Sequence, residues 1–174
     1  MKTVNEQEVT LVTLTEELRA EFLAMAEEYL AVGEDRYKAA QGDFSAYLRR
    51  LSDALRGINL PPGAVSYSAF WLVAGRRLLG RSTVRHHLTP ALEYEGGHVG
   101  YDIRPSQRGK GYGTLILRLT LGEARRLGLR RVLLTCDTDN LGSVKVIEKN
   151  GGVLRDTAIS QTSGKRISRY WIEL

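Results

Sequence analysis

Residues 98–114 of this chain read HVGYDIRPSQRGKGYGT and carry its strongest structural signal. An apolar strand pattern ends near Ile103, and Pro105 then lacks the backbone N–H that further pairing would need. Three alternating glycines follow before helical spacing begins: Gly109, Gly111 and Gly113. Glycine permits positive φ and leaves no side chain to block a close ligand. The N–H groups of such a turn, at the positive end of a helix, form an anion site that fits a diphosphate.

Other interpretations of this loop are weaker. A glycine-rich turn can join a strand to a helix without binding anything, because short motifs recur by chance. The loop is not a Walker loop, since no Gly-Lys-Ser/Thr closes it. A dinucleotide-binding loop would need a following acidic residue at a strand end and a repeating parallel βαβ order. The pattern therefore favours another phosphate-bearing ligand, with Arg108 and Lys110 adding positive charge.

Hydrophobic periodicity predicts one α/β domain over residues 1–174. We expect strands at 9–14, 67–73, 78–88, 98–103, 131–136, 153–160 and 166–174. We expect helices at 15–33, 43–57, 115–127 and 140–150, with Thr15 and Asp43 as N-caps. Residues 74–76 suit a hairpin turn, and residues 89–97 suit a loop. This order predicts a mixed sheet with helices on its faces and with some parallel strand pairs.

Composition narrows the classes of function. Hydrophobic residues make up 43% of the chain, enough for a packed core. No run approaches the roughly 18 apolar residues of a spanning helix, and the N-terminus lacks the order of a secretory signal. The single cysteine, Cys136, has no disulfide partner, which favours a reducing cytoplasm. The net charge of +5 is divided among short clusters without a basic tail, so we expect neither nucleic acid nor a membrane as partner.

Three motifs resemble those of the GNAT superfamily of acyl-CoA-dependent N-acyltransferases. Arg108-x-x-Gly111-x-Gly113 resembles its (Gln/Arg)-x-x-Gly-x-(Gly/Ala) pyrophosphate motif, and residues 97–105 resemble its fourth strand. Residues 139–152, DNLGSVKVIEKNGG, resemble its second motif, a short helix that ends in glycine. The resemblance covers residues 66–174 in order and spacing, and residues 1–65 only in pattern. It implies a mixed, mostly antiparallel sheet of about seven strands flanked by about four helices, with acetyl-CoA as co-substrate and no metal.

The resemblance also implies a set of coenzyme A contacts. In this family the fourth and fifth strands splay apart, and the pantetheine arm pairs with the backbone at the position of Ile103. Asn140 matches a residue whose side-chain amide bonds to the arm, and we expect Ser143 to add a hydroxyl contact. Helix capping and an ordinary helix-face position are the alternatives for these two residues. The loop amides would hold the pyrophosphate at Arg108, Gly109, Lys110, Gly111, Tyr112, Gly113 and Thr114.

The catalytic groups that the resemblance implies are less complete. His98 stands where many relatives have a glutamate base, and a pKa of about 6.5 lets histidine accept the ammonium proton. A half-buried strand histidine is the alternative. Ile147 stands where relatives often have a tyrosine acid, so Tyr101 or Tyr170 would have to replace it. A thiolate whose thiol has a pKa of about 8.5 also leaves without an acid. The expected oxyanion donor is a backbone N–H near Tyr101.

Together these inferences predict an N-acetyltransferase that moves an acetyl group from acetyl-CoA to a primary amine by direct attack in a ternary complex. A non-catalytic coenzyme A-binding or sensor domain is the alternative, because the tyrosine is missing. The acceptor, the acyl chain and the oligomeric state stay open, although family members often form homodimers. His86 and His87 point to opposite faces of a strand and make a poor metal pair. The following acidic residues suit either a cationic amine or a solvated helix face: Glu27, Glu28, Glu34 and Asp35.

Overall fold

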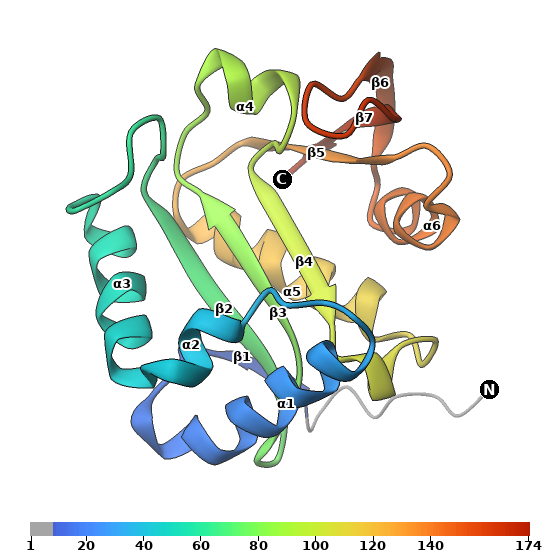
Figure 1. Cartoon of the computed structure of the whole chain (residues 1–174). Coiled ribbons are helices and arrows are strands. Elements are labelled where there is room, and N and C mark those ends of the chain that lie inside the picture. The colour runs from blue at the N-terminus through green and yellow to red at the C-terminus, as the bar shows by residue number, and fades with distance from the viewer. Residues whose placement is uncertain (1–8) are drawn as a thin grey trace.

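The computed structural model describes residues 9–174, which form two antiparallel sheets (Figure 1). The first sheet has the order β1-β2-β3-β4 and contains β1 (Val9–Val12), β2 (Tyr67–Ala74), β3 (Arg77–Arg85) and β4 (Val99–Ile103). The second has the order β5-β7-β6 and contains β5 (Arg131–Asp137), β6 (Val153–Ile159) and β7 (Arg166–Glu173). The seven expected strands are therefore confirmed, and so is their mostly antiparallel pairing.

Within the described residues 9–174, six α-helices and two 3-10 turns accompany the strands. The helices are α1 (Arg19–Ala31), α2 (Lys38–Gly42), α3 (Phe44–Arg56), α4 (Pro90–Tyr94), α5 (Tyr112–Arg126) and α6 (Leu141–Lys149). The turns are η2 (Glu16–Leu18) and η3 (Pro105–Gln107). Asp43 caps α3 as expected, because its Oδ1 accepts from Ala46 N at 2.8 Å. Gly57 ends that helix in the left-handed conformation.

Several expectations about these elements were wrong. No parallel ladder joins strands within residues 9–174, since the expected single sheet is divided in two. Thr15 precedes η2 but makes no capping hydrogen bond through its side chain. The expected strand 78–88 ends at Arg85, and α5 begins three residues before the expected Leu115. The short helices α2 and α4 were missed because five residues give too little periodicity for detection.

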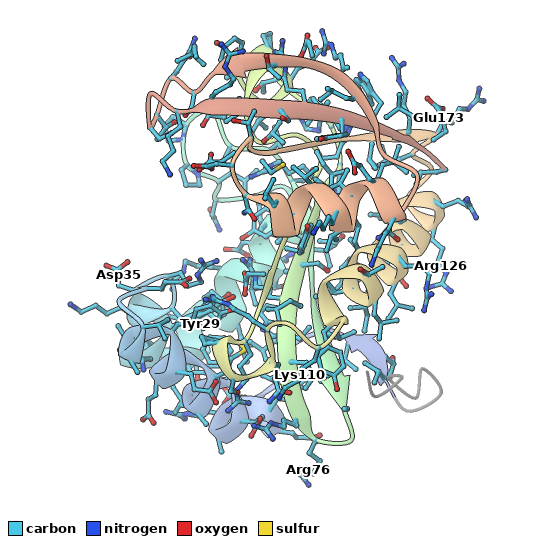
Figure 2. The ribbon with its side chains drawn as sticks, turned by 90° about the vertical axis from the view of Figure 1, so that its right-hand side faces the viewer. Tyr29, Asp35, Arg76, Lys110, Arg126 and Glu173 are labelled. Atoms are coloured by element: carbon cyan, nitrogen blue, oxygen red, sulfur yellow. The ribbon has the colours of Figure 1, made fainter. Side chains whose placement is uncertain are left out.

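Helices cover both faces of the first sheet. The aromatic core beneath α1, α2 and α3 includes Phe22, Tyr29, Phe44 and Trp71, all of them almost fully buried. The opposite face packs Leu72 and Leu79 against α5. Figure 1 shows α1 and α2 in front of this sheet and α5 behind it. Figure 2 shows α6 beneath the three-stranded sheet and beside α5, so these two helices link the sheets on one side.

The two sheets meet where β4 and β5 begin. His98 N donates to Leu133 O at 2.7 Å, and Leu133 N donates to Nδ1 of His98 at 3.0 Å. Beyond this junction β4 pairs with β3 and β5 pairs with β7, so the facing edges of β4 and β5 diverge. Gly97 makes the close approach possible: its φ is +63°, and a Cβ there would lie 2.3 Å from Leu133 O. The splayed pair thus depends on a glycine and a histidine.

We expect Gly97→Ala to destabilise the protein by roughly 2 kcal/mol or more, because it combines a left-handed backbone with a main-chain clash. The matched control is Gly122→Ala in α5, where an added Cβ meets nothing within 4 Å. That change should stabilise by about 0.5–1 kcal/mol, since alanine is the better helix former. Urea denaturation measures the free energy of unfolding of both variants. Equal effects of the two substitutions would show that the β4–β5 junction tolerates a side chain at Gly97.

Candidate active site

The loop between β4 and α5 presents a row of free backbone donors. Within residues 9–174, no acceptor is recorded for the N–H groups of residues 109–114, and the first capped amide is Leu115 N on Gly111 O at 3.3 Å. Gly109 and Gly111 have φ values of +73° and +88°. An added Cβ at Gly109 would meet only open space. These amides begin a 15-residue helix, so its positive end adds to their attraction for an anion.

Helix α1 fastens this loop to the body of the protein. Arg104 is only 5% exposed, and its side chain forms ion pairs with Glu21 and with Glu28, the latter at 2.7 Å. Glu28 also accepts from Ser106 N at 3.2 Å. Burial works against ionisation of Glu28, but the hydrogen bonds from Ser106 and Arg104 outweigh it and lower the pKa of this carboxyl. The acidic helix face is therefore occupied in binding the loop.

The two basic side chains of the loop are also held locally. Arg108 donates to Ile103 O at 3.0 Å and to Glu34 at 2.8 Å, and its guanidinium lies 5.6 Å from the Tyr29 ring centroid. Lys110 Nζ donates to Ser106 O at 2.7 Å and to Gln107 Oε1 at 3.1 Å. Figure 2 shows Lys110 at this loop and Tyr29 on the neighbouring helix. Both cations keep positive charge beside the free amides while they shape the loop.

The free edge of β4 exposes main-chain groups to the gap beside β5. In an antiparallel ladder the N–H and C=O of one residue point the same way, and neighbours alternate. Arg104 N donates to Leu79 O and His98 O accepts from Arg85 N, so the even-numbered residues of this stretch face β3. The backbone groups of Tyr101 and Ile103 consequently face the gap, where the Ile103 C=O already accepts from Arg108 Nε and the other three groups are left. An extended ligand lying in the gap could pair with them.

Two hydroxyl groups converge beside this gap. The Tyr101 hydroxyl is buried, and no other residue within 9–174 gives it a hydrogen bond of good geometry. Burial raises the pKa of Tyr101, while the nearby Ser143 hydroxyl opposes part of that shift. Tyr101 therefore stays protonated at neutral pH and can donate. Ser143 N donates to Asn140 Oδ1 at 3.1 Å, so Asn140 caps α6 and keeps its amide NH₂ as a separate donor.

The other positions considered for an acid lie in the core. Ile147 is 1% exposed and packs between α5 and the second sheet, so this position is filled by apolar packing. Tyr170 is buried on β7 in the same cluster. Cys136 lies there too, and burial raises its thiol pKa to about 11, which makes it a poor nucleophile. Of the two tyrosines, only Tyr101 lies on β4 beside the gap.

His98 has a structural task that the sequence did not reveal. Its Nδ1 accepts the Leu133 N–H, so the neutral ring carries its proton on Nε2. To act as a base, the ring would first have to give up that hydrogen bond. Burial lowers the pKa of His98, and the charges of Arg85 and Arg131 lower it further. The base role expected for His98 stays a prediction, and this geometry weighs against it.

Sequence reasoning missed a carboxylate on the other face of β4. Asp102 accepts hydrogen bonds from Tyr29 and Tyr37, the latter at 3.2 Å, and forms an ion pair with Arg36 at 3.3 Å. Burial and the charge of Asp102 raise the pKa of both tyrosines well above the ordinary value, so both remain donors. The cluster ties α1 and the segment after it to β4. Only a known strand register could have brought these distant residues together.

Among residues 9–174, no group of three or more histidine, cysteine, aspartate or glutamate side chains is placed to hold a metal ion. No helix in that range is both long enough and apolar enough to cross a bilayer.

Comparison with known proteins identifies similar sequences and folds. The model of the acetyltransferase (GNAT) domain matches residues 8–153. A Salmonella typhimurium acetyltransferase that modifies the N-terminal serine of ribosomal protein L7/L12 is 16% identical, with a TM-score of 0.69 over 96% of this chain and 95% of that chain. RimL, the ribosomal L7/L12 alpha-N-protein acetyltransferase solved with coenzyme A, is 16% identical, with a TM-score of 0.71 over 96% and 94%. Mycobacterium smegmatis RimJ, solved with CoA-disulfide, is 16% identical, with a TM-score of 0.72 over 95% and 81%. A search among curated proteins finds no match.

The depressed pKa of His98 makes stability depend on pH. The unfolded chain, with a His pKa of about 6.5, binds more protons than the folded one in the window below that value. The contribution of neutral His98 is thus present above about pH 6.5 and is lost as the pH falls through the folded pKa. We expect the free energy of unfolding of His98→Asn, which retains an acceptor, to fall less steeply from pH 6.5 to 5 than that of the unchanged protein. Parallel curves would mean that His98 is not desolvated as described.

Proposed function

Since the chain belongs to the GNAT family of acetyltransferases, we propose that it transfers an acetyl group from acetyl-CoA to a primary amine by direct attack in a ternary complex. The observation that carries this proposal is the row of free amides at 109–114, at the head of α5 and beside the open edge of β4. A diphosphate with an extended arm matches both features at once. Neither feature alone would specify such a ligand.

The proposed binding residues follow the order of the cosubstrate. The amides of the loop would bind the pyrophosphate, and the main chain of Ile103 would pair with the pantetheine arm. The Asn140 amide and the Ser143 hydroxyl would contact the arm from the start of α6. The full proposed set is Ile103, Arg108, Gly109, Lys110, Gly111, Tyr112, Gly113, Thr114, Asn140 and Ser143.

The chemistry proposed for the gap uses Tyr101 twice. Acetyl-CoA supplies a thioester carbonyl that a neutral amine can attack, so a C–N bond forms as the C–S bond breaks. The Tyr101 N–H faces the gap and would stabilise the negative charge that develops on the carbonyl oxygen. Its hydroxyl would donate a proton to the departing sulfur, because burial keeps it protonated. The ammonium proton would pass to water, or to His98 if the ring releases Leu133.

A non-catalytic coenzyme A-binding domain is the second candidate function. The observation that favours it is Ile147, which fills a core position and supplies no proton. The two candidates differ in one measurement: an enzyme releases free thiol from acetyl-CoA when an amine is added, and a sensor does not. A cytoplasmic location and a homodimeric assembly also stay predictions.

We expect Gly111→Ala to weaken coenzyme A binding at least 10-fold, because a Cβ at φ +88° reshapes the amide row. Gly128→Ala is the matched control, since Gly128 has a φ of +85° just beyond the other end of α5. Both substitutions should reduce stability by about 1–2 kcal/mol, but only the first should reduce affinity. Isothermal titration with coenzyme A measures the difference. Similar affinity in both variants would place the diphosphate elsewhere.

We expect Tyr101→Phe to lower kcat about 10-fold or more while leaving the affinity for coenzyme A unchanged. The phenyl ring keeps the packing and removes only the hydroxyl. Thiol release from acetyl-CoA with a good amine acceptor measures kcat. An unchanged kcat would show that the thiolate leaves without help from Tyr101, and the hydroxyl would then lose its assigned role.

A further inference from the structure

We propose that the acceptor amine carries an anionic group, a carboxylate or a phosphate, which binds between Arg81 and Arg85 in a hollow beside Gly100. This inference rests on the proposed function, because it names the class of acceptor for the same site. It begins from the register of β2, β3 and β4, which determines which side chains share one face of the sheet.

Three rows of side chains cross this face. The first row contains Trp71, Arg81 and Asp102, and it lies at the core beneath α1, α2 and α3. The second row contains Ala69, Thr83 and Gly100. The third contains Tyr67, Arg85 and His98. The middle row consists of small residues between two rows of large ones, so the face is hollow there.

The hollow has a volume of about 400 Å³, which is sufficient for a small amine. Thr83 forms part of its floor, and Tyr67, Arg81 and Arg85 form walls. Residues 63–65 and Leu92 of α4 close its remaining sides. At Gly100 an added Cβ would lie 3.4 Å from the Thr83 hydroxyl. The absence of a side chain at Gly100 therefore leaves space on the strand that borders the gap.

The charges around the hollow are only partly balanced by protein groups: burial works against the charge of Arg81, and nearby Tyr47, Tyr37 and Asp102 offset this and raise its pKa. The Arg81 guanidinium lies 5.4 Å from the Trp71 ring centroid, and its Nε is buried without a hydrogen-bond partner among residues 9–174. Arg85 donates through one nitrogen to Gly97 O at 2.9 Å, which fixes it as a wall. Neither arginine forms an ion pair with a carboxylate in the described part of the chain.

The surroundings leave these cations available to a ligand. Asp102, in the same row as Arg81, is already bound by Tyr29, Tyr37 and Arg36. Burial lowers the pKa of Arg85, and the nearby charge of Arg81 lowers it further. An anion between the two guanidinium groups would offset this repulsion and would satisfy the unused donor of Arg81.

The position of the hollow sets the size of the acceptor. Adjacent strands lie about 4.8 Å apart, so an anion above Thr83 is one strand away from Gly100 and the gap edge. The amine must reach the carbonyl near the Tyr101 N–H. A separation of a few bonds between amine and anion meets both requirements. An α-amino acid and a short aminoalkyl phosphate are the two sources with this chemistry.

The test uses three acceptors on one skeleton: ethanolamine, serine and phosphoethanolamine. With the unchanged protein we expect kcat/KM to be about 10- to 100-fold higher for an anionic acceptor than for ethanolamine, as charge-assisted hydrogen bonds would give. Serine and phosphoethanolamine distinguish the carboxylate from the phosphate. Arg81→Met should reduce that ratio to near one with no change in the KM for acetyl-CoA, and Arg81→Lys should retain part of it. Arg76→Met is the control, because Arg76 lies exposed at the tip of the β2–β3 hairpin (Figure 2).

Binding provides a second readout that does not depend on turnover. We expect N-acetylserine or inorganic phosphate to bind the protein saturated with coenzyme A, and binding to be lost in Arg81→Met. Equal use of ethanolamine and the anionic acceptors would overturn the inference, as would the same ratio in Arg81→Met or no binding of either anion. Failure to bind coenzyme A would instead contradict the proposed function, so the two failures are distinct.

Discussion

The main-chain contact between the two sheets is concentrated at His98 and Leu133. If β4 and β5 continued as a paired ladder, the N–H and C=O groups of Tyr101 and Ile103 would be used up within the protein. Because the strands part after one residue, the groups of Tyr101 and the N–H of Ile103 remain directed into the gap, while the Ile103 C=O is bound by Arg108. Buried backbone groups need partners, so a gap of this kind is suited to a ligand with its own amides. The histidine that ends the pairing therefore determines where a ligand can begin.

The charges around the loop that begins α5 are committed to internal contacts. A net charge of +5 could suggest a polyanion as partner. The structure instead places Arg104, Arg108 and Arg36 against carboxylates of α1 and the segment after it, or against Asp102. After those pairs are counted, the cations that stand out are Arg81 and Arg85, which form no ion pair in the described part of the chain. Local balance is thus a better guide to ligands than the total charge.

The sequence was sufficient for features that depend on neighbouring residues. Positive φ at Gly109 and Gly111, the cap at Asn140 and the caps of α3 are local, and each matched its pattern. The family itself could be recognised from the same local motifs. Features that need a long-range register could not be predicted. The partner of His98 lies 35 residues away, and the tyrosines that bind Asp102 lie more than 60 residues away.

Two features of the fold show why the other predictions from sequence failed. The division into two sheets depends on where β4 stops following β5, and strand patterns contain no information on that point. The row of small side chains that leaves a hollow at Thr83 can be recognised only when the register of β2, β3 and β4 is known. Arg81 looks like an ordinary strand charge until that alignment is known.

Helix α1 couples the two sides of the candidate site mechanically. Glu28 of α1 and Glu34, three residues after its end, hold the loop that begins α5, while Tyr29 of α1 holds β4 through Asp102. The same helix therefore contacts both the loop with the free amides and the strand that borders the gap. A displacement of α1 that shifted this loop would therefore also strain the hydrogen bond that joins α1 to β4.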